Sequence, residues 1–228
     1  MKHLLEVCTC RCHHLGEYAG NPFSRYTLTK KWYGLATRYI LNPEYIHDTC
    51  NIIEHIQNNT FASLCNKELN ENFKEAVEYT QENNIDTYLI EISSRKYIDQ
   101  SSGKWLKFNE EQFSDKLQYI RDLCKDVRII WVAPANIQFT DDHMEVFSET
   151  YRERIFNHEG RIISRAWIEQ QLRSMESDEH VIYPSDMFLD MKSEHVFNPK
   201  NLKDITHYSV DALEIISRNV TDKLKEIL

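Results

Sequence analysis

Four short apolar runs along the chain are predicted to form β-strands. The run over 127–134, VRIIWVAP, gives the clearest signal because it is dense in β-branched and aromatic residues. The other three runs are HLLEV over 3–7, IDTYLIEIS over 85–93 and EHVIYP over 179–184.

Stretches in which apolar residues recur with helical spacing lie between these runs. Residues 45–59 show this spacing from Ile46 to Ile53, and a helix over 108–126 is predicted to have Asn109 as its N-cap. Further helices are predicted over 27–40 with a threonine as N-cap, over 66–84, over 143–175 as one helix or as two broken near Gly160, and over 207–228.

This alternation of strands and helices is typical of a parallel sheet with helices on both faces. We therefore predict an α/β fold, a three-layer α/β/α sandwich with a mostly parallel sheet in which strands 3–7, 85–93 and 127–134 are neighbours. A length of 228 residues, 41% of them hydrophobic, suits a single domain over 1–228. Ligands of such sheets bind beyond the carboxyl ends of the strands, so a site is expected in the loops that follow them.

Charge and composition narrow the classes of partner. The formal net charge is −9, which argues against nucleic acid because phosphate binding relies on clustered Lys and Arg. The chain has no run of about 18 apolar residues, so no membrane span is expected. Its first residues, MKHLLEVCTC, lack the apolar region of a secretory signal. These features predict a cytoplasmic protein with reduced thiols.

The stretch CTCRCHH over 8–14 allows three interpretations. Metal binding is disfavoured because zinc sites typically use C-x-x-C pairs and no second ligand pair follows. A redox site is disfavoured because C-x-x-C spacing is missing. Cysteines at a strand end also act as small apolar packing residues, and we expect this of Cys8 and Cys12. Cys10 is the candidate for a reactive thiol, and no cofactor is expected.

A second candidate lies at the other end of the chain, where NLKDITHYS over 201–209 carries Asp204 and His207. A carboxylate that orients an imidazole is the base half of a catalytic triad. A structural role is also open, in which Asp204 or Thr206 caps the terminal helix. Spacing alone does not choose between these roles, because triads are defined by geometry.

Taken together, the two ends resemble the SGNH (GDSL-like) hydrolase superfamily, in which a nucleophile follows the first strand and D-x-x-H precedes the last helix. The block CTCR further resembles the GSCFA-like subgroup, which has cysteine in the nucleophile position. The resemblance implies a flavodoxin-like sheet with Cys10 as nucleophile, His207 as base and Asp204 as the residue that orients it. Cys8 stands where the subgroup has glycine.

The chain departs from the family in the expected source of oxyanion stabilisation, because EISSRK stands where the family has Gly-x-Asn-Asp. We expect Ser93, Ser94 or Asn136 to supply this stabilisation instead. Arg11 is expected to help lower the pKa of the neighbouring thiol, because an adjacent positive charge favours thiolate.

Other polar residues have more than one possible role. His47 either lines the cleft or, more simply, belongs to a helix start capped by Asp48. Arg25, Arg38 and Arg95 are open to binding an anionic substrate, although charged residues mostly form solvated faces.

The resemblance implies a hydrolase or acyltransferase that acts on an ester, with an acyl-sugar or polysaccharide as substrate class and polysaccharide biosynthesis as the process. The alternative is a catalytically weak or inactive SGNH-like module that binds a glycan or a protein partner. Metal or redox binding by the cysteine cluster is the third hypothesis.

Overall fold

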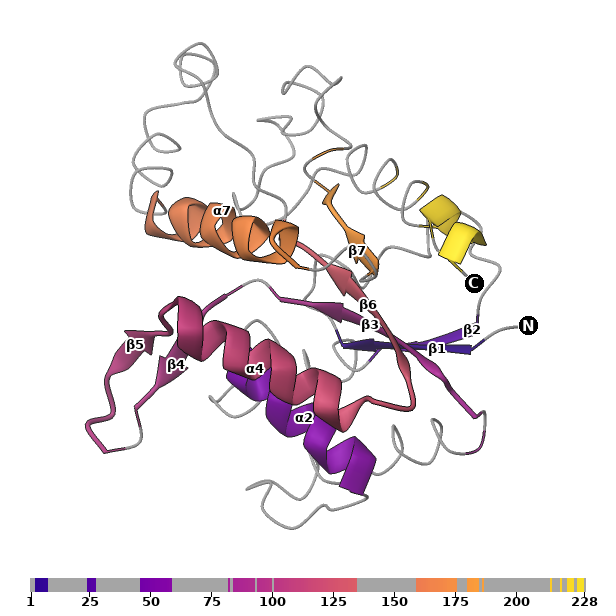
Figure 1. Cartoon of the computed structure of the whole chain (residues 1–228), viewed down its shortest axis with the longest axis horizontal. Coiled ribbons are helices and arrows are strands. Elements are labelled where there is room, and N and C mark those ends of the chain that lie inside the picture. The colour runs from indigo at the N-terminus through magenta and orange to yellow at the C-terminus, as the bar shows by residue number, and fades with distance from the viewer. Residues whose placement is uncertain are drawn as a thin grey trace.

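The structure is a computed structural model of the whole chain. It describes residues 3–7, 24–27, 46–58, 82, 84–92, 94–99, 101–134, 159–175, 180–184, 186, 214, 218, 221–223 and 225–227. The elements follow the order β1 (His3–Val7), β2 (Ser24–Thr27), α2 (Ile46–Asn58), β3 (Thr87–Glu91), β4 (Lys96–Ile98), β5 (Trp105–Lys107), α4 (Glu110–Leu123), β6 (Arg128–Val132), α7 (Glu159–Arg173) and β7 (His180–Ile182) (Figure 1).

A parallel sheet with strand order β2-β1-β3-β6-β7 forms the centre of the fold. Each of the four predicted apolar runs contributes a strand to it, and β1, β3 and β6 are neighbours, as expected. The chain therefore has an α/β fold with a parallel sheet. β4 and β5 form a separate antiparallel hairpin that projects beside α4 (Figure 1).

One local prediction was wrong. Asp48 is not a helix cap, because α2 already begins at Ile46 and the backbone of Asp48 is inside its first turn. Thr27, the first residue of the stretch predicted as a helix over 27–40, is the last residue of β2, since Ser24–Thr27 pairs in parallel with β1 along its whole length. The rest of that prediction, residues 28–40, lies outside the described part.

The helices agree with the amphipathic stretches wherever the structure describes them. α2 and α4 match the helices predicted over 45–59 and 108–126, and α7 begins at Glu159, next to Gly160. The described positions after residue 213 are helical, in agreement with a terminal helix. Most of 66–84 and all of 143–158 lie outside the described part. No helix in the ranges given above is long and apolar enough to cross a membrane.

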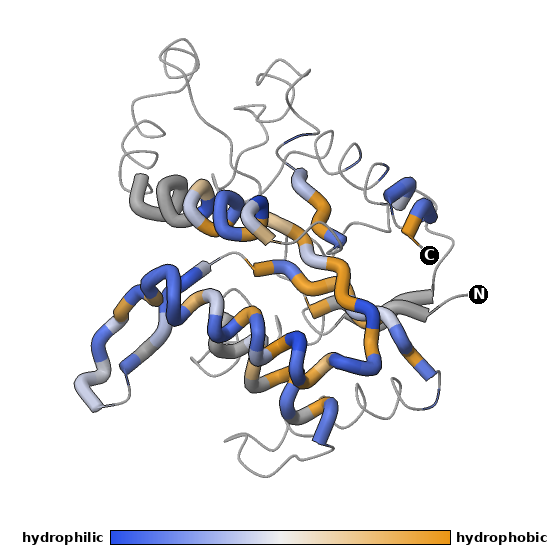
Figure 2. Tube along the Cα trace, viewed as in Figure 1, coloured by the Kyte–Doolittle hydropathy of each residue, from blue (hydrophilic) through white to orange (hydrophobic). Residues whose placement is uncertain are grey.

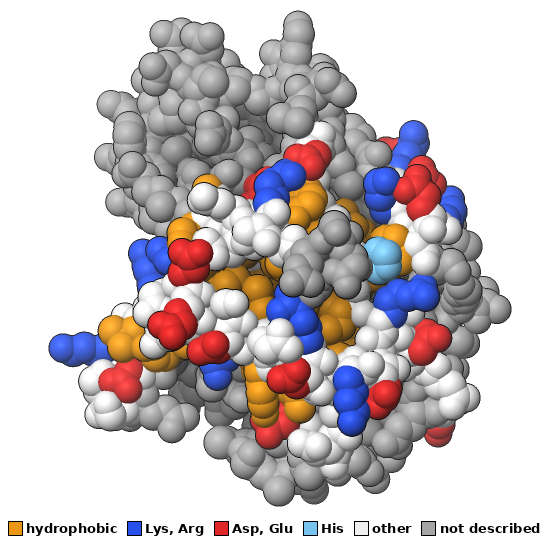
Figure 3. Space-filling model, viewed as in Figure 1, with side chains coloured by type: hydrophobic (Ala, Val, Ile, Leu, Met, Phe, Trp, Pro, Cys, Tyr) orange, Lys and Arg blue, Asp and Glu red, His pale blue; other side chains and the backbone are white. Residues whose placement is uncertain are grey.

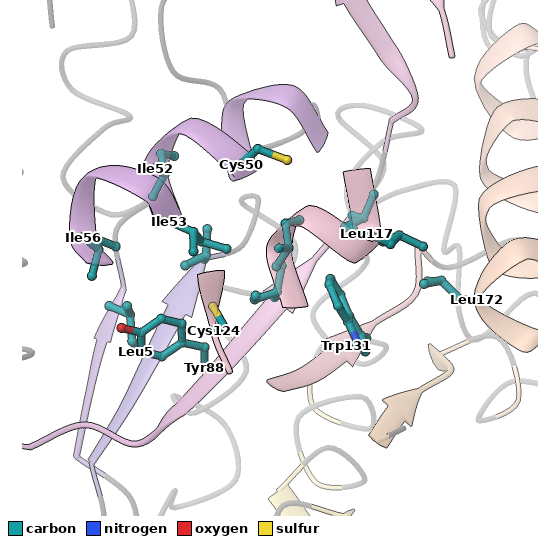
Figure 4. Packing of buried hydrophobic residues seen from close by; sticks show 14 of the residues in the cluster. Leu5, Cys50, Ile52, Ile53, Ile56, Tyr88, Leu117, Cys124, Trp131 and Leu172 are labelled. Atoms are coloured by element: carbon teal, nitrogen blue, oxygen red, sulfur yellow. The ribbon is translucent and has the colours of Figure 1, made fainter. Parts of the chain in front are cut away.

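One face of the sheet packs against α2, α4 and α7. Strand side chains of one parity, such as Val7, Ile90 and Trp131, share a buried cluster with side chains of the three helices (Figure 4). Figure 2 shows the pattern that produces this cluster: β3 and β6 are mostly hydrophobic, whereas hydrophobic and hydrophilic positions alternate along α4.

Strand residues of the other parity are buried as well. Leu89 and Ile130 are 0% exposed, although they do not belong to the cluster beneath the three helices. On the same parity, Arg128 Nη1 donates a hydrogen bond to the carbonyl oxygen of Ile227 at 3.0 Å. The carboxyl end of the terminal helix therefore contacts the amino end of β6.

Helix α4 begins at a reciprocal capping box. The Asn109 side chain accepts a hydrogen bond from the Gln112 N–H at 2.9 Å, and the Gln112 side chain accepts one from the Asn109 N–H at 3.1 Å. These two bonds satisfy main-chain donors that the first turn of a helix leaves without partners. The N-cap expected from the sequence is thus confirmed.

We expect Asn109→Ala to lower the free energy of unfolding by about 1 kcal/mol, the usual contribution of an N-cap side chain. Urea unfolding followed by circular dichroism measures this loss. Asn109→Asp is the matched control, because aspartate keeps the accepting oxygen and should stay close to wild type. An alanine variant as stable as the aspartate variant would contradict a stabilising role for the cap.

Candidate functional site

The carboxyl ends of the strands are level with one another along one edge of the sheet. Val7 at the end of β1 pairs with Ile90 of β3, and Glu91 at the end of β3 pairs with Val132 of β6. The same residue of β6 pairs with Ile182 at the end of β7. β1, β3, β6 and β7 therefore end at one common edge of the sheet.

Most of the site residues expected from the sequence lie outside the described part of the chain. This holds for Cys10, Arg11, Ser93, Asn136, Asp204 and His207. The structure places the backbone of His47 in the first turn of α2. It places Ser94 directly beyond the carboxyl end of β3, and the contacts of this serine are described.

Ser94 has a local structural contact at this edge. Its Oγ accepts a hydrogen bond from the Lys96 N–H at 3.3 Å, where the chain turns into β4. This bond leaves the hydroxyl hydrogen available as a donor, because accepting one bond does not use it. A role as an oxyanion donor stays a prediction.

Arg95 has a packing role that the sequence did not suggest. Its guanidinium carbon lies 4.1 Å from the ring centroid of Trp167 on α7, and Nη1 donates to the Phe108 carbonyl oxygen at 3.4 Å. Tyr97 stacks on Phe108 with ring centroids 4.3 Å apart, and Phe113 meets the edge of Trp167 at 5.1 Å. Arg95 is therefore half-buried among aromatic rings and joins the β4–β5 hairpin to α7.

A second arginine holds the segment that follows β7. Arg173 near the end of α7 contacts Glu169 with Nε at 3.0 Å and Nη2 at 2.7 Å, and Nη2 also pairs with Asp186. The guanidinium lies over the ring of Tyr183, 4.0 Å from its centroid. The hydrogen bond to Asp186 raises the pKa of Arg173 above its ordinary value. These contacts fix α7 to the chain just beyond β7, at the carboxyl edge.

We expect Arg173→Met to lower the free energy of unfolding by about 1–2 kcal/mol, because it removes charged hydrogen bonds from the nearly buried Glu169. Chemical denaturation gives this value. Arg218→Met is the matched control, because Arg218 pairs with Glu214 on an exposed helix face and such pairs contribute about 0–1 kcal/mol. Equal losses in the two variants would contradict a specific role for Arg173.

The two cysteines whose side chains are described are structural. Cys50 and Cys124 are both buried thiols, and Cys50 Sγ donates to the Lys116 carbonyl oxygen at 3.8 Å. Burial raises the pKa of the Cys124 thiol to about 12, so this thiol stays protonated near neutral pH. Neither of these two cysteines forms a disulfide, which agrees with the expectation of reduced thiols.

Glu91 is a site candidate that the sequence analysis did not single out. It is 2% exposed at the carboxyl end of the central strand β3 and faces away from the cluster of α2, α4 and α7. Burying a carboxylate is costly unless polar groups surround it, so Glu91 indicates a polar environment beneath the common edge. The signal in the sequence was a single acidic residue within the apolar run TYLIEI.

Comparisons with known proteins do not assign this chain to a family. No family model and no curated protein matches this chain. Within the part that the structure describes, no group of three or more His, Cys, Asp or Glu side chains is arranged to hold a metal ion. The CTCRCHH stretch, for which metal binding was considered, lies outside that part.

Proposed function

We propose that the chain is an SGNH-like hydrolase or acyltransferase in which Cys10 attacks an ester, His207 acts as base and Asp204 orients the imidazole. The observation that carries the proposal is the parallel pairing of β1, β3 and β6. This pairing supports a common edge for the segments CTCR after β1, ISSRK after β3 and PAN after β6. Active sites of parallel α/β sheets form at that edge.

The position of the terminal helix supports the other half of the triad. The contact between Arg128 and Ile227 lies at the amino end of β6, which is the edge opposite the proposed site. A helix over 207–228 would be about 30 Å long, whereas a five-residue strand spans about 17 Å. If the helix runs back along the sheet, its first residues reach the carboxyl edge, where His207 and Cys10 would meet.

The same contact supports a three-layer α/β/α sandwich. Helices α2, α4 and α7 cover one face, and Arg128, which contacts the terminal helix, has the parity of the opposite face. Leu89 and Ile130 are fully buried on that opposite face. Buried apolar residues on both faces of a parallel sheet are typical of this architecture.

The proposed reaction has two steps. His207 takes the thiol proton as Cys10 Sγ attacks the ester carbonyl carbon, and the resulting tetrahedral intermediate expels the alcohol, which receives that proton from the imidazolium. A thioester remains on Cys10. Water then hydrolyses the thioester, or an acceptor hydroxyl takes the acyl group, with His207 again removing the proton of the attacking group.

Hydrolysis of 4-nitrophenyl acetate and release of acetate from an O-acetylated polysaccharide test the proposal. We expect wild type to turn over at least one of them, Cys10→Ala to fall to background, and Cys8→Ala and Cys12→Ala to stay active. Mass spectrometry should find one acetyl group on the peptide that contains Cys10. Full activity of Cys10→Ala would overturn the triad. Glycan binding by wild type without turnover would favour the weak or inactive binding module.

A further inference from the structure

A hollow of about 670 Å³ lies at the amino edge of the sheet, opposite the proposed catalytic edge. It is formed by the end of α4, the turn that follows, and the first residues of β6 and β7. The polar lining residues within the described part are Arg121, Cys124, Lys125, Asp126, Arg128 and His180. Figure 3 shows Lys and Arg side chains near the histidine on this face of the molecule.

The lining of this hollow is positively charged, although the chain as a whole is acidic. Among the lining residues that the structure describes, three cationic side chains and the carboxylate of Asp126 sum to a formal charge of +2 with His180 neutral. The whole chain has a formal charge of −9. The Cys124 thiol adds no negative charge, because burial raises its pKa to about 12. The hollow therefore concentrates positive charge on a protein that otherwise repels anions.

Basic residues near the end of a helix often serve only to pair with its last carbonyl groups. In α4 the backbone performs part of this task. The Cys124 N–H donates to the carbonyl oxygens of Ile120 and Arg121 at 3.0 and 3.1 Å, and the Val127 N–H donates to the Cys124 carbonyl oxygen at 2.8 Å. Two of the last four carbonyl groups of α4 therefore do not need a basic side chain as partner.

The basic side chains that line the hollow differ in the contacts that they make with other described residues. Lys125 makes no hydrogen bond or ion pair with any of the described residues. Arg128 is oriented by the bond from its Nη1 to the Ile227 carbonyl oxygen, which uses one of its five N–H groups. The hollow is thus lined by an oriented guanidinium and by an ammonium group without a partner among the described residues, an arrangement that suits an anion.

We propose that this hollow binds a phosphorylated small molecule, with Arg128 and Lys125 as the principal contacts to the phosphate. Guanidinium groups match phosphate oxygens in geometry, and ammonium groups add a mobile charge. A volume of about 670 Å³ is within the usual range for small-molecule sites. The site lies on the edge opposite the proposed triad and does not depend on the proposed function.

Isothermal titration calorimetry with ribose 5-phosphate and with inorganic phosphate, on the full chain at low salt, tests the proposal. We expect Lys125→Gln to weaken binding of ribose 5-phosphate about tenfold, as loss of one charged hydrogen bond implies. Asp126→Asn should strengthen it by about two- to fivefold, the range of an exposed charge interaction. Lys104→Gln is the matched control, because this exposed lysine of the β4–β5 hairpin lies outside the hollow.

Thermal unfolding of each variant checks that the fold is retained. Equal weakening by Lys104→Gln and Lys125→Gln would overturn the proposal and indicate diffuse attraction by surface charge. If neither ribose 5-phosphate nor inorganic phosphate binds at millimolar concentration, the proposal is also overturned. Weaker binding of ribose 5-phosphate by Lys125→Gln, together with tighter binding by Asp126→Asn, supports the site whether or not the chain hydrolyses esters.

Discussion

Trp131→Ala is expected to lower the free energy of unfolding by about 3–5 kcal/mol, the usual cost of truncating a buried aromatic residue. Trp131 is 0% exposed in β6, and its neighbours in the sheet are Ile90 and Val181. It belongs to the cluster that joins the sheet to α4 and α7 (Figure 4). Because domains are stable by only about 5–15 kcal/mol, this variant should be largely unfolded in mild denaturant.

Trp105→Ala provides a matched control for the same chemical change. Trp105 is 46% exposed on β5, outside the main sheet, so its loss should change stability by less than about 1 kcal/mol. Urea unfolding followed by far-ultraviolet circular dichroism avoids the loss of tryptophan fluorescence in both variants. Similar midpoints for the two variants would show that Trp131 is not in the core of the sheet.

β3 and β6 could be predicted because they are buried on both faces. Leu89 and Ile90 point to opposite sides of β3, and both are 0% exposed, so the sequence shows a continuous apolar run there. α4 could be predicted because its signals are local, with Asn109 as cap and apolar positions at helical spacing. β2 is different: its residues SRYT are too few and too polar to stand out, and pairing with β1 determines their conformation.

The β4–β5 hairpin was missed although its turn has local signals. Asp99 accepts hydrogen bonds from Ser101 and Ser102, and Gly103 has φ +65°, a left-handed conformation that favours glycine. The strands themselves are only three residues long. Contacts distant in sequence, such as the stacking of Tyr97 on Phe108, stabilise them, and no local pattern reports such contacts.

The candidate site was only partly predictable for a similar reason. The common edge follows from strand alternation, so the position of Ser94 beyond β3 was expected. The stacking of Arg95 on Trp167 was not, because the two residues are far apart in sequence and only the fold brings them together. Glu91 was missed because an acidic residue within an apolar run is usually assigned to an exposed face.

Cys10 is expected to be the most reactive thiol of the chain. If His207 pairs with it, the pKa of Cys10 should fall from the free value of about 8.5 to about 7.5 or lower. A thiolate of lower pKa is also a weaker nucleophile, so at pH 6 the net gain in alkylation rate over an ordinary exposed cysteine is only about three- to tenfold. The midpoint of the pH–rate profile is therefore a sharper readout than the rate at one pH.

Limiting iodoacetamide, with peptide mapping at several pH values, measures both quantities for every cysteine. Cys124 is the internal control: with a pKa of about 12 and a relative exposure of only 2%, it should react at least about 10³-fold more slowly than Cys10 in the native chain. His207→Ala should move the midpoint for Cys10 up by about one pH unit, because it removes the imidazolium that stabilises the thiolate. Asp204→Asn should move the midpoint less, because it alters the orientation of the ring without removing it.

The contradicting outcome is an equal midpoint for Cys8, Cys10 and Cys12 that His207→Ala leaves unchanged. The cysteine-rich stretch would then serve only for packing at a strand end, and the proposed esterase chemistry would lose its nucleophile.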